Sequence, residues 1–146
     1  MLVRDYMTPD PTTLNSDACL LDAALMIRHS GKRHVPIVTR DGKAVGIISD
    51  RDVSRLSPSM LGQVSQEEYN RIFESTPIAT VMTKSPITIA PNAPIADAVS
   101  VLYRKKIGAL LVVENEKLVG ILTLSDMLVL LNNLLGRKSS ANASGQ

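Results

Sequence analysis

The segment VGIISDRD, residues 45–52, is the most informative stretch of this chain, because it returns almost unchanged as VGILTLSD at residues 119–126. Upstream of each copy, MTPDP at residues 7–11 is matched by MTKSP at residues 82–86. The copies differ in length by one residue at the turn that the first copy makes through Asp41-Gly42. A repeat present only twice predicts paired half-domains rather than a solenoid, which needs three or more stacked units.

The length of 146 residues fits one compact domain or two very small ones. Each copy spans only about fifty residues, a size that buries too little surface to be more than marginally stable alone. We therefore expect the two copies to pack together and share one core. Apolar residues make up 45% of the chain and aromatic residues only 3%, with no Trp, so that core is expected to be aliphatic.

Charge and composition exclude several classes of protein. The net charge of +2 is too balanced to indicate a nucleic-acid binder, and the basic runs at 104–106 and 137–138 are expected to end helices. The single Cys19 cannot form an intrachain disulfide, and no apolar run approaches the roughly 20 residues of a membrane span. The N-terminus also lacks the apolar run of a signal peptide, which favours a cytoplasmic protein. Two His residues without paired acids at ligand spacing predict no metal site.

The hydrophobic pattern predicts an α/β fold in which each copy has the order βαββα. In the first copy we expect a strand at 12–14, a helix starting from residues 15–17 and ended by Gly31, strands at 35–38 and 44–48, and a helix at 50–56. In the second copy we expect a strand at 87–89, a helix at 94–106, strands at 109–113 and 118–123, and a helix at 124–135.

The repeat also divides the chain into domains: 1–57, a linker at 58–77, 78–136, and a disordered tail at 137–146. The linker is expected to turn at 57–59 and to form a short polar helix over 66–74. Tyr69, Ile72 and Phe73 are expected to pin that helix to the module. At the second hairpin, Asn115 replaces the glycine of the first, because Asn tolerates left-handed geometry.

The repeated polar pair follows a strand and opens a helix, as Ser49 with Asp52 and as Thr123 with Asp126. Three residues apart, the two side chains lie on one face of the first helical turn. They can cap the helix, with the acid completing a capping box. They can instead bind a ligand, with the acid accepting hydrogen bonds from paired hydroxyls. Composition alone favours the cap.

The pattern Gly-apolar-apolar-(Ser/Thr)-x-x-Asp, preceded by Met-Thr-x-x-Pro and a paired strand, resembles the CBS domain. Two copies over residues 2–135 look like a CBS domain pair, or Bateman module, which implies tandem domains packed about a pseudo-two-fold axis. RHVP at 33–36, SDRDV at 49–53 and SPS at 57–59 resemble the CBS pair of the acetoin-utilisation regulatory proteins. Those proteins carry a further ACT domain, which we do not expect in these 146 residues.

In CBS domains this Asp binds the ribose hydroxyls of an adenosine ligand, so the resemblance implies that role for Asp52 and Asp126. In the γ subunit of AMP-activated protein kinase, which shares the module, basic residues before the second strand and the residue preceding the Asp contact phosphate. The resemblance therefore implies a ligand site in the first copy at Thr13, Arg33, His34, Val35, Pro36, Ser49, Arg51 and Asp52. In the second copy it implies a site at Thr88, Gly108, Ala109, Leu110, Leu111, Thr123, Ser125 and Asp126.

Simpler interpretations of these residues stay open. His34 can be a solvated side chain at a strand edge, and Arg51 a solvated helix residue. An adenine ring is expected to sit between strands of the same copy, lined by Val35 with Pro36 or by Leu110 with Leu111 and closed by Thr13 or Thr88. Ordinary core packing is the simpler interpretation of the aliphatic residues, and both can hold together.

The resemblance implies a non-catalytic regulatory sensor that binds AMP, ADP or ATP in the cleft between the two domains. The second copy has no cations at the phosphate positions, which favours a less charged adenosyl compound there. CBS pairs commonly dimerise through their helices, so a homodimer and an effector protein of unknown identity are the expected partners. A ligand-free interaction scaffold and a weak nucleic-acid binder are the alternatives. An enzyme is not expected, because no nucleophile–base arrangement or phosphate-binding loop is visible.

Overall fold

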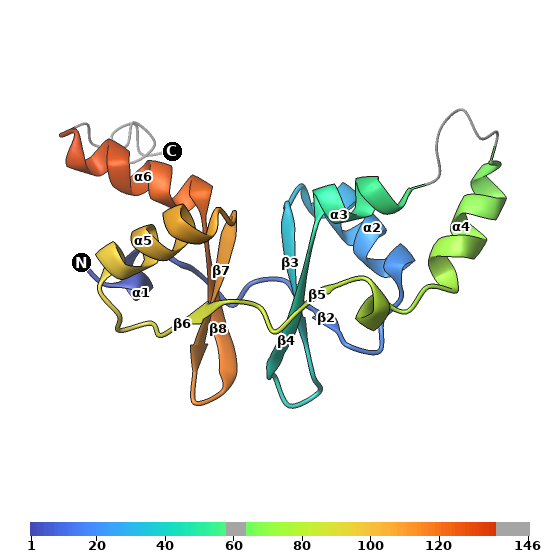
Figure 1. The fold of residues 1–146 in the computed structure, drawn as a ribbon, viewed down its shortest axis with the longest axis horizontal. Helices are drawn as coiled ribbons and strands as arrows, with labels where there is room; N and C mark the ends of the chain where they lie inside the picture. Colours follow the sequence, from blue (N-terminus) through green and yellow to red (C-terminus); the bar gives the residue numbers. More distant parts are fainter. Residues whose placement is uncertain (58–63, 137–146) are drawn as a thin grey trace. The chain divides into compact units, whose positions relative to one another are not determined.

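The computed structural model describes residues 1–57 and 64–136 (Figure 1). It divides into two compact units. One, the N-terminal unit, consists of residues Thr12–Pro86; the other, the C-terminal unit, joins Met1–Pro11 to the segment that begins at Ile87.

The N-terminal unit is a four-stranded sheet with helices on one side (Figure 1). Its strand order is β2-β3-β4-β5, with β2 parallel to β3 and the other pairs antiparallel. In chain order its elements are β2 (Leu14–Asn15), α2 (Leu20–Ser30), β3 (His34–Val38), β4 (Ala44–Ser49), α3 (Asp50–Leu56), α4 (Gln66–Glu74), the 3₁₀ turn η2 (Ile78–Thr80) and β5 (Thr83–Lys84).

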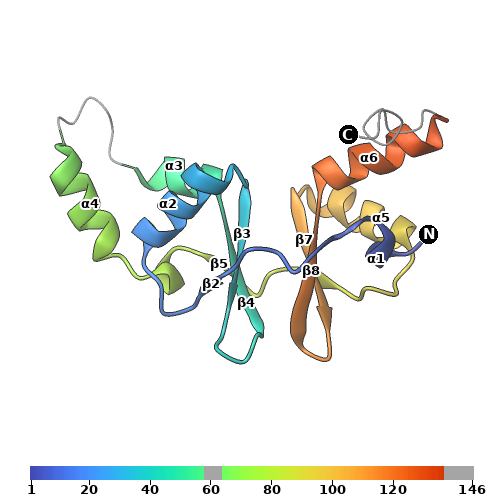
Figure 2. The same cartoon turned by 180° about the vertical axis from the view of Figure 1, so that it is seen from behind.

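The C-terminal unit has the same topology, which Figure 2 shows from behind. Its sheet runs β1-β8-β7-β6, and β6 is parallel to β7. Its elements are α1 (Val3–Tyr6), β1 (Thr8–Pro9), β6 (Thr88–Ile89), α5 (Ile95–Lys105), β7 (Ala109–Glu114), β8 (Lys117–Thr123) and α6 (Leu124–Leu134). The predicted α/β fold with two βαββα copies is confirmed.

The lead-in of each copy folds with the sheet of the other copy. Strand β1 precedes the first copy but pairs with β8, with Thr8 opposite Ile121. Strand β5 precedes the second copy but pairs with β4, with Thr83 opposite Ile47. The predicted domain boundaries at residues 57 and 78 follow the sequence repeat. Each compact unit instead contains the lead-in that precedes the other copy.

The exchange explains why Met and Gly recur together in both copies. A Cβ atom on Gly120 of β8 would lie 2.5 Å from the Sδ atom of Met7, so the methionine lies directly over the glycine. A Cβ atom on Gly46 of β4 would likewise overlap the Sδ atom of Met82. Each repeated Met–Gly pair is therefore a contact in which only a glycine leaves room for the methionine of the exchanged lead-in.

Each unit has its own hydrophobic core, and the expected packing of the two copies around one shared core stays a prediction. Exchanged and linker segments contribute to these cores: Val3 of the lead-in joins the C-terminal core, and Phe73 and Ile78 join the N-terminal one. The C-terminal core is built from Val3, Ile95, Ala98, Leu102, Leu110, Val112, Leu122 and Leu130. The N-terminal core is built from Leu20, Ala23, Ala24, Val35, Ile37, Ile48, Phe73 and Ile78.

The predicted linker helix forms as α4 and is part of the N-terminal unit. Phe73 is fully buried, and its ring stacks on Tyr69 with centroids 4.3 Å apart. The prediction for Ile72 is wrong, because its side chain lies on the outer face of α4 and is 43% exposed. The core is thus aliphatic apart from the single Phe of the chain.

The start of α2 differs from the prediction, while other termini agree. Asn15 forms a turn in which its Oδ1 atom accepts from the backbone N–H of Asp17, 2.9 Å away, and the helix begins at Leu20 instead. Gly31 ends α2 at φ 71°, as expected. Asn115 at the second hairpin has φ 52°, which confirms its left-handed geometry.

The basic run at 104–106 ends α5 as predicted, with Arg104 and Lys105 in its last turn. No helix within 1–57 and 64–136 is long and apolar enough to cross a membrane. The predicted tail at 137–146, and residues 58–59 of the predicted turn, lie outside the described residues.

Candidate functional site

The polar pair of the N-terminal unit lies where β4 passes into α3. Ser49 is the N-cap residue, and its Oγ atom accepts from the backbone N–H of Asp52 at 3.2 Å. The Oδ2 atom of Asp52 accepts from the backbone N–H and from the hydroxyl of Ser49, both at 2.9 Å. This is a capping box, which fixes the orientation of the carboxylate at the helix start.

The C-terminal unit repeats the arrangement where β8 passes into α6. Thr123 caps the helix, and the Oδ2 atom of Asp126 accepts from the Thr123 backbone N–H at 2.8 Å and from its hydroxyl at 3.1 Å. Both acids are half-buried. The capping role that composition favoured is therefore present in both copies, and in both it uses chiefly one oxygen of the carboxylate.

The second oxygen differs between the copies. In the N-terminal unit, the Oδ1 atom of Asp52 accepts a hydrogen bond from the Nη2 atom of Arg55 at 2.6 Å. At the matching position of α6 stands Val129, whose side chain is exposed. Within the part of the chain that the structure describes, no hydrogen bond to Oδ1 of Asp126 is found.

The register of β3 against β4 brings the predicted phosphate residues to this corner. His34 is directly opposite Ser49, and the carbonyl of Arg33 accepts from the backbone N–H of Asp50 at 2.9 Å. His34 is half-buried rather than solvated. Burial lowers the pKa of His34, an effect that the nearby Asp50 and Asp52 oppose and Arg33 reinforces.

Arg51 follows Asp50 on the first turn of α3. Its side chain is exposed, which agrees with the solvated alternative and also leaves it accessible to a ligand. In the C-terminal unit the same register places Ala109 opposite Thr123, and the carbonyl of Gly108 accepts from Leu124 N–H at 3.2 Å. Gly108, Ala109 and Ser125 therefore occupy the positions of Arg33, His34 and Arg51 without their charge.

The predicted adenine-slot residues alternate between the two faces of their strands. Val35 and Leu110 belong to the cores on the helix side, so their side chains fit the structural interpretation. Pro36 and Leu111 are also buried but, as neighbours along a strand, point to the opposite face. The side chains of each pair therefore cannot line the same slot, and the assignment of a slot stays a prediction.

The two threonines predicted to close the sites occupy matching places at the first strands. Thr88 begins β6 opposite Leu111, whose N–H donates to the carbonyl of Ile87 at 3.2 Å. Thr13, the counterpart of Thr88, lies just before β2, which begins at Leu14. Strand β2 therefore begins one residue later than β6 does, because the counterpart of Leu111 is Pro36, which has no N–H to donate.

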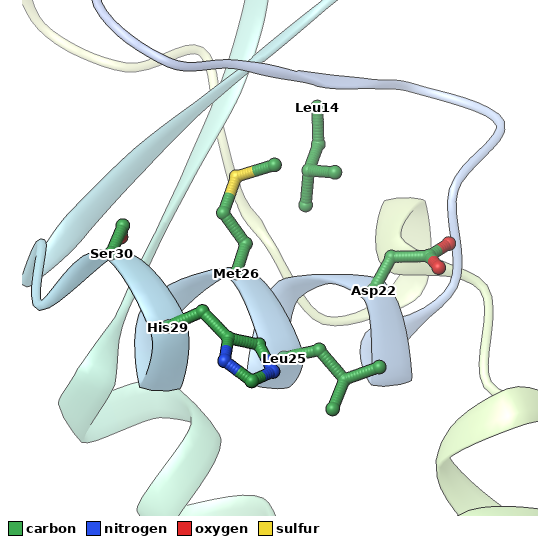
Figure 3. Close-up of a pocket in the computed structure, with 6 residues that line it drawn as sticks. All are labelled: Leu14, Asp22, Leu25, Met26, His29 and Ser30. Atoms are coloured by element: carbon green, nitrogen blue, oxygen red, sulfur yellow. The ribbon is translucent and has the colours of Figure 1, made fainter.

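One hollow, of about 460 Å³, lies beside α2 (Figure 3). Leu25, Met26 and His29 of α2 line it together with Leu14, Asp22 and Ser30, and Met26 points toward Leu14. None of the predicted ligand residues lines this hollow. No group of three His, Cys, Asp or Glu side chains within the described ranges is placed to hold a metal ion.

The comparison with known proteins decides the family. The model of the CBS domain family matches residues 3–59 and again 78–133. The chain belongs to the CBS domain family. A CBS domain-containing protein of Dictyostelium discoideum is 30% identical over 137 residues, which cover 92% of this chain and 94% of that protein.

Two solved structures of CBS proteins are similar over nearly the whole chain. AcuB of Vibrio cholerae, a candidate acetoin utilization protein, has 34% identity, a TM-score of 0.76 and 93% coverage of both chains. The CBS domain pair of MJ0100, solved with 5′-methylthioadenosine and S-adenosyl-L-methionine, has 27% identity, a TM-score of 0.73 and coverage of 91% and 97%. The resemblance to a CBS pair of the acetoin-utilisation type is confirmed.

Several longer relatives carry enzyme names, among them a tRNA nucleotidyltransferase of Aquifex aeolicus and homoserine O-acetyltransferases of methanogens. This chain covers only 14% of the former and 23–24% of the latter. The shared segment is the CBS pair, which is generally a regulatory and non-catalytic module.

Proposed function

We propose that this CBS pair is a regulatory sensor in which Asp52 and Asp126 accept hydrogen bonds from the ribose hydroxyls of adenosine-containing ligands. The observation that carries the proposal is the pair of matching carboxylates, each held at a helix start by its own capping box. The capping bonds fix the carboxylate before a ligand arrives. Oδ2 of each acid already accepts two of these bonds, so Oδ1 is the oxygen with a lone pair to offer to the ribose hydroxyls.

The expected affinity is substantial because the acceptor is ionised. A hydrogen bond to a charged group contributes about 1.5–3 kcal/mol, so losing one carboxylate should weaken its site by about tenfold or more. That the CBS pair of MJ0100 was solved with two adenosyl compounds supports this ligand class.

The charges around the two acids favour different ligands. Arg33, His34 and Arg51 surround the start of α3, and a phosphate needs such cations or backbone N–H donors. We therefore assign AMP, ADP or ATP to the N-terminal unit. The uncharged counterparts in the C-terminal unit favour a less charged adenosyl compound.

The output of the sensor is proposed to pass through a homodimer and an effector protein. Helix α6 exposes an apolar stripe at heptad-like spacing, formed by Leu124, Leu128 and Leu131 and continued by the C-cap residue Leu135. The positions in and just after α3 that match the three helix residues are the polar Asp50, Ser54 and Ser57. A second copy of the chain would cover this stripe, and ligand would act by binding two conformations with different affinities. We place the sensor in the cytoplasm, a reducing compartment that suits its free Cys19.

The experiment is a thermal unfolding assay with AMP, ATP, 5′-methylthioadenosine and S-adenosyl-L-methionine. Ligand at a hundred times Kd should stabilise the protein by about 2.7 kcal/mol. Asp52→Asn and Asp126→Asn should each remove part of that shift, while the amide oxygen still accepts the capping bond.

Matched controls separate capping from binding. Asp22 caps α2 in the same manner, with its Oδ2 atom 3.0 Å from the Cys19 backbone nitrogen, and Asp5 caps α1 at 2.8 Å from the Leu2 nitrogen. Asp22→Asn and Asp5→Asn should lower Tm and leave the ligand shift intact. If no ligand of the panel stabilises the wild-type protein, the ligand-free scaffold replaces the sensor.

A further inference from the structure

Arg55 distinguishes the two carboxylates that otherwise match. Asp52 has both oxygens engaged, because Ser49 occupies Oδ2 and the guanidinium of Arg55 lies 2.6 Å from Oδ1. The corresponding residue of α6 is Val129, which carries no polar atom in its side chain. A ligand hydroxyl that approaches Oδ1 therefore meets a competitor in one unit but not in the other.

We propose that Arg55 is a built-in competitor for the ligand hydroxyls, which makes the N-terminal site selective for adenosine compounds that carry an anionic group. This inference rests on the proposed function, since it assumes that Asp52 accepts ribose hydroxyls. It adds Arg55 to the residues proposed to determine ligand specificity in the N-terminal unit.

The geometry shows which partner of the ion pair would move. The Asp52 side chain is only 16% exposed and is held by its capping box, whereas the Arg55 side chain is 73% exposed. An ion pair whose arginine is solvated costs little to open, equivalent to about a two- to fivefold change in affinity. Arg55 is therefore the mobile group, and Asp52 stays in place.

The anionic group of the ligand determines whether the free-energy cost of opening the Arg55–Asp52 ion pair is compensated. Arginine forms forked hydrogen bonds with phosphate as well as with carboxylate, so a phosphate near the corner can replace Asp52 as the partner of Arg55. A bare nucleoside displaces Arg55 and offers it nothing in return. Adenosine is thus expected to prefer the C-terminal unit, and AMP the N-terminal unit.

The test measures adenosine and AMP binding by calorimetry on the full chain, with Asp126→Asn as background so that one site remains. In that background the Arg55→Val variant should bind adenosine about two- to fivefold tighter. Its AMP affinity should stay equal or fall, so the preference for AMP over adenosine decreases. Arg71→Val, which removes the same charge from α4, should leave that preference unchanged.

The reciprocal experiment transfers the competitor. Val129→Arg, in an Asp52→Asn background, should weaken adenosine binding at the C-terminal site by about two- to fivefold. The inference is overturned if Arg55→Val leaves the preference for AMP unchanged or changes both affinities equally. If neither adenosine nor AMP binds the wild-type chain, the proposed function fails as well, so the two failures are distinguishable.

Discussion

Replacing Gly120 by alanine tests the exchange of lead-ins, on which both candidate sites depend for their sheets. Gly120 lies in β8 opposite Pro9 of β1 and is buried. Its new Cβ atom would lie 2.5 Å from the Sδ atom and 3.1 Å from the Cγ atom of Met7, and 3.1 Å from the carbonyl oxygen of Thr8. The methionine can shift, but the carbonyl belongs to the backbone of β1.

The expected cost follows from those contacts. Overpacking of a closely packed site costs about 1–3 kcal/mol. Alanine also restricts the unfolded chain, which returns about 0.4–1 kcal/mol. We therefore expect Gly120→Ala to lower the free energy of unfolding by about 1–2 kcal/mol, measured by urea denaturation.

The matching glycine provides an internal comparison. The three atoms nearest to a Cβ on Gly46 all belong to the Met82 side chain. Adding Met82→Ala to Gly46→Ala should therefore relieve the clash, with a coupling energy of about 1 kcal/mol in a double-mutant cycle. Adding Met7→Ala to Gly120→Ala should relieve it only in part. Neutral single mutants without coupling would refute the exchange.

Three further predictions concern other parts of the molecule. Because burial lowers the pKa of His34 below 6.5, the unfolded state binds more protons, so stability should fall as pH drops through 6.5 and stay constant above it. His34→Gln should flatten this dependence in denaturation curves, and an unchanged slope would contradict it. Phe73→Ala should cost about 3–5 kcal/mol, since the ring is fully buried between α4 and the core; a loss below 1 kcal/mol would show that α4 does not pack there. Leu128→Asp on α6 should weaken the dimer at least about tenfold in sedimentation, while Leu25→Asp on α2 should not; a monomeric wild-type protein would contradict the proposed assembly.

The repeat was sufficient to predict the βαββα order and the polar pairs. At each strand-to-helix junction the hydrophobic period changes from that of a strand to that of a helix, and a capping residue, Ser49 or Thr123, stands where it changes. The exchange of lead-ins could not be predicted. Strands β1 and β5 are two exposed residues each, and Met7 and Met82 face glycines in nearly identical sequences. Local sequence therefore gives no preference for one partner over the other.

Two other differences have similar causes. Residues 15–17 are all good N-cap types. The later start of α2 is accompanied by contacts that the local pattern does not show: Asp22 accepts from Cys19 N–H, and Leu20 N–H donates to the carbonyl of Thr76. Arg55 was missed because an exposed arginine three residues after an aspartate is a common surface pair. Its significance appears only when Asp52 is seen with both oxygens occupied and Asp126 with one.

The central claim is that the two carboxylates receive the ribose hydroxyls, and its most direct measurement compares adenosine with 2′,3′-dideoxyadenosine by calorimetry. The wild-type chain should bind adenosine about tenfold tighter or more, and this difference should vanish in the Asp52→Asn, Asp126→Asn double variant. Equal affinity of the wild-type chain for the two nucleosides would contradict the account.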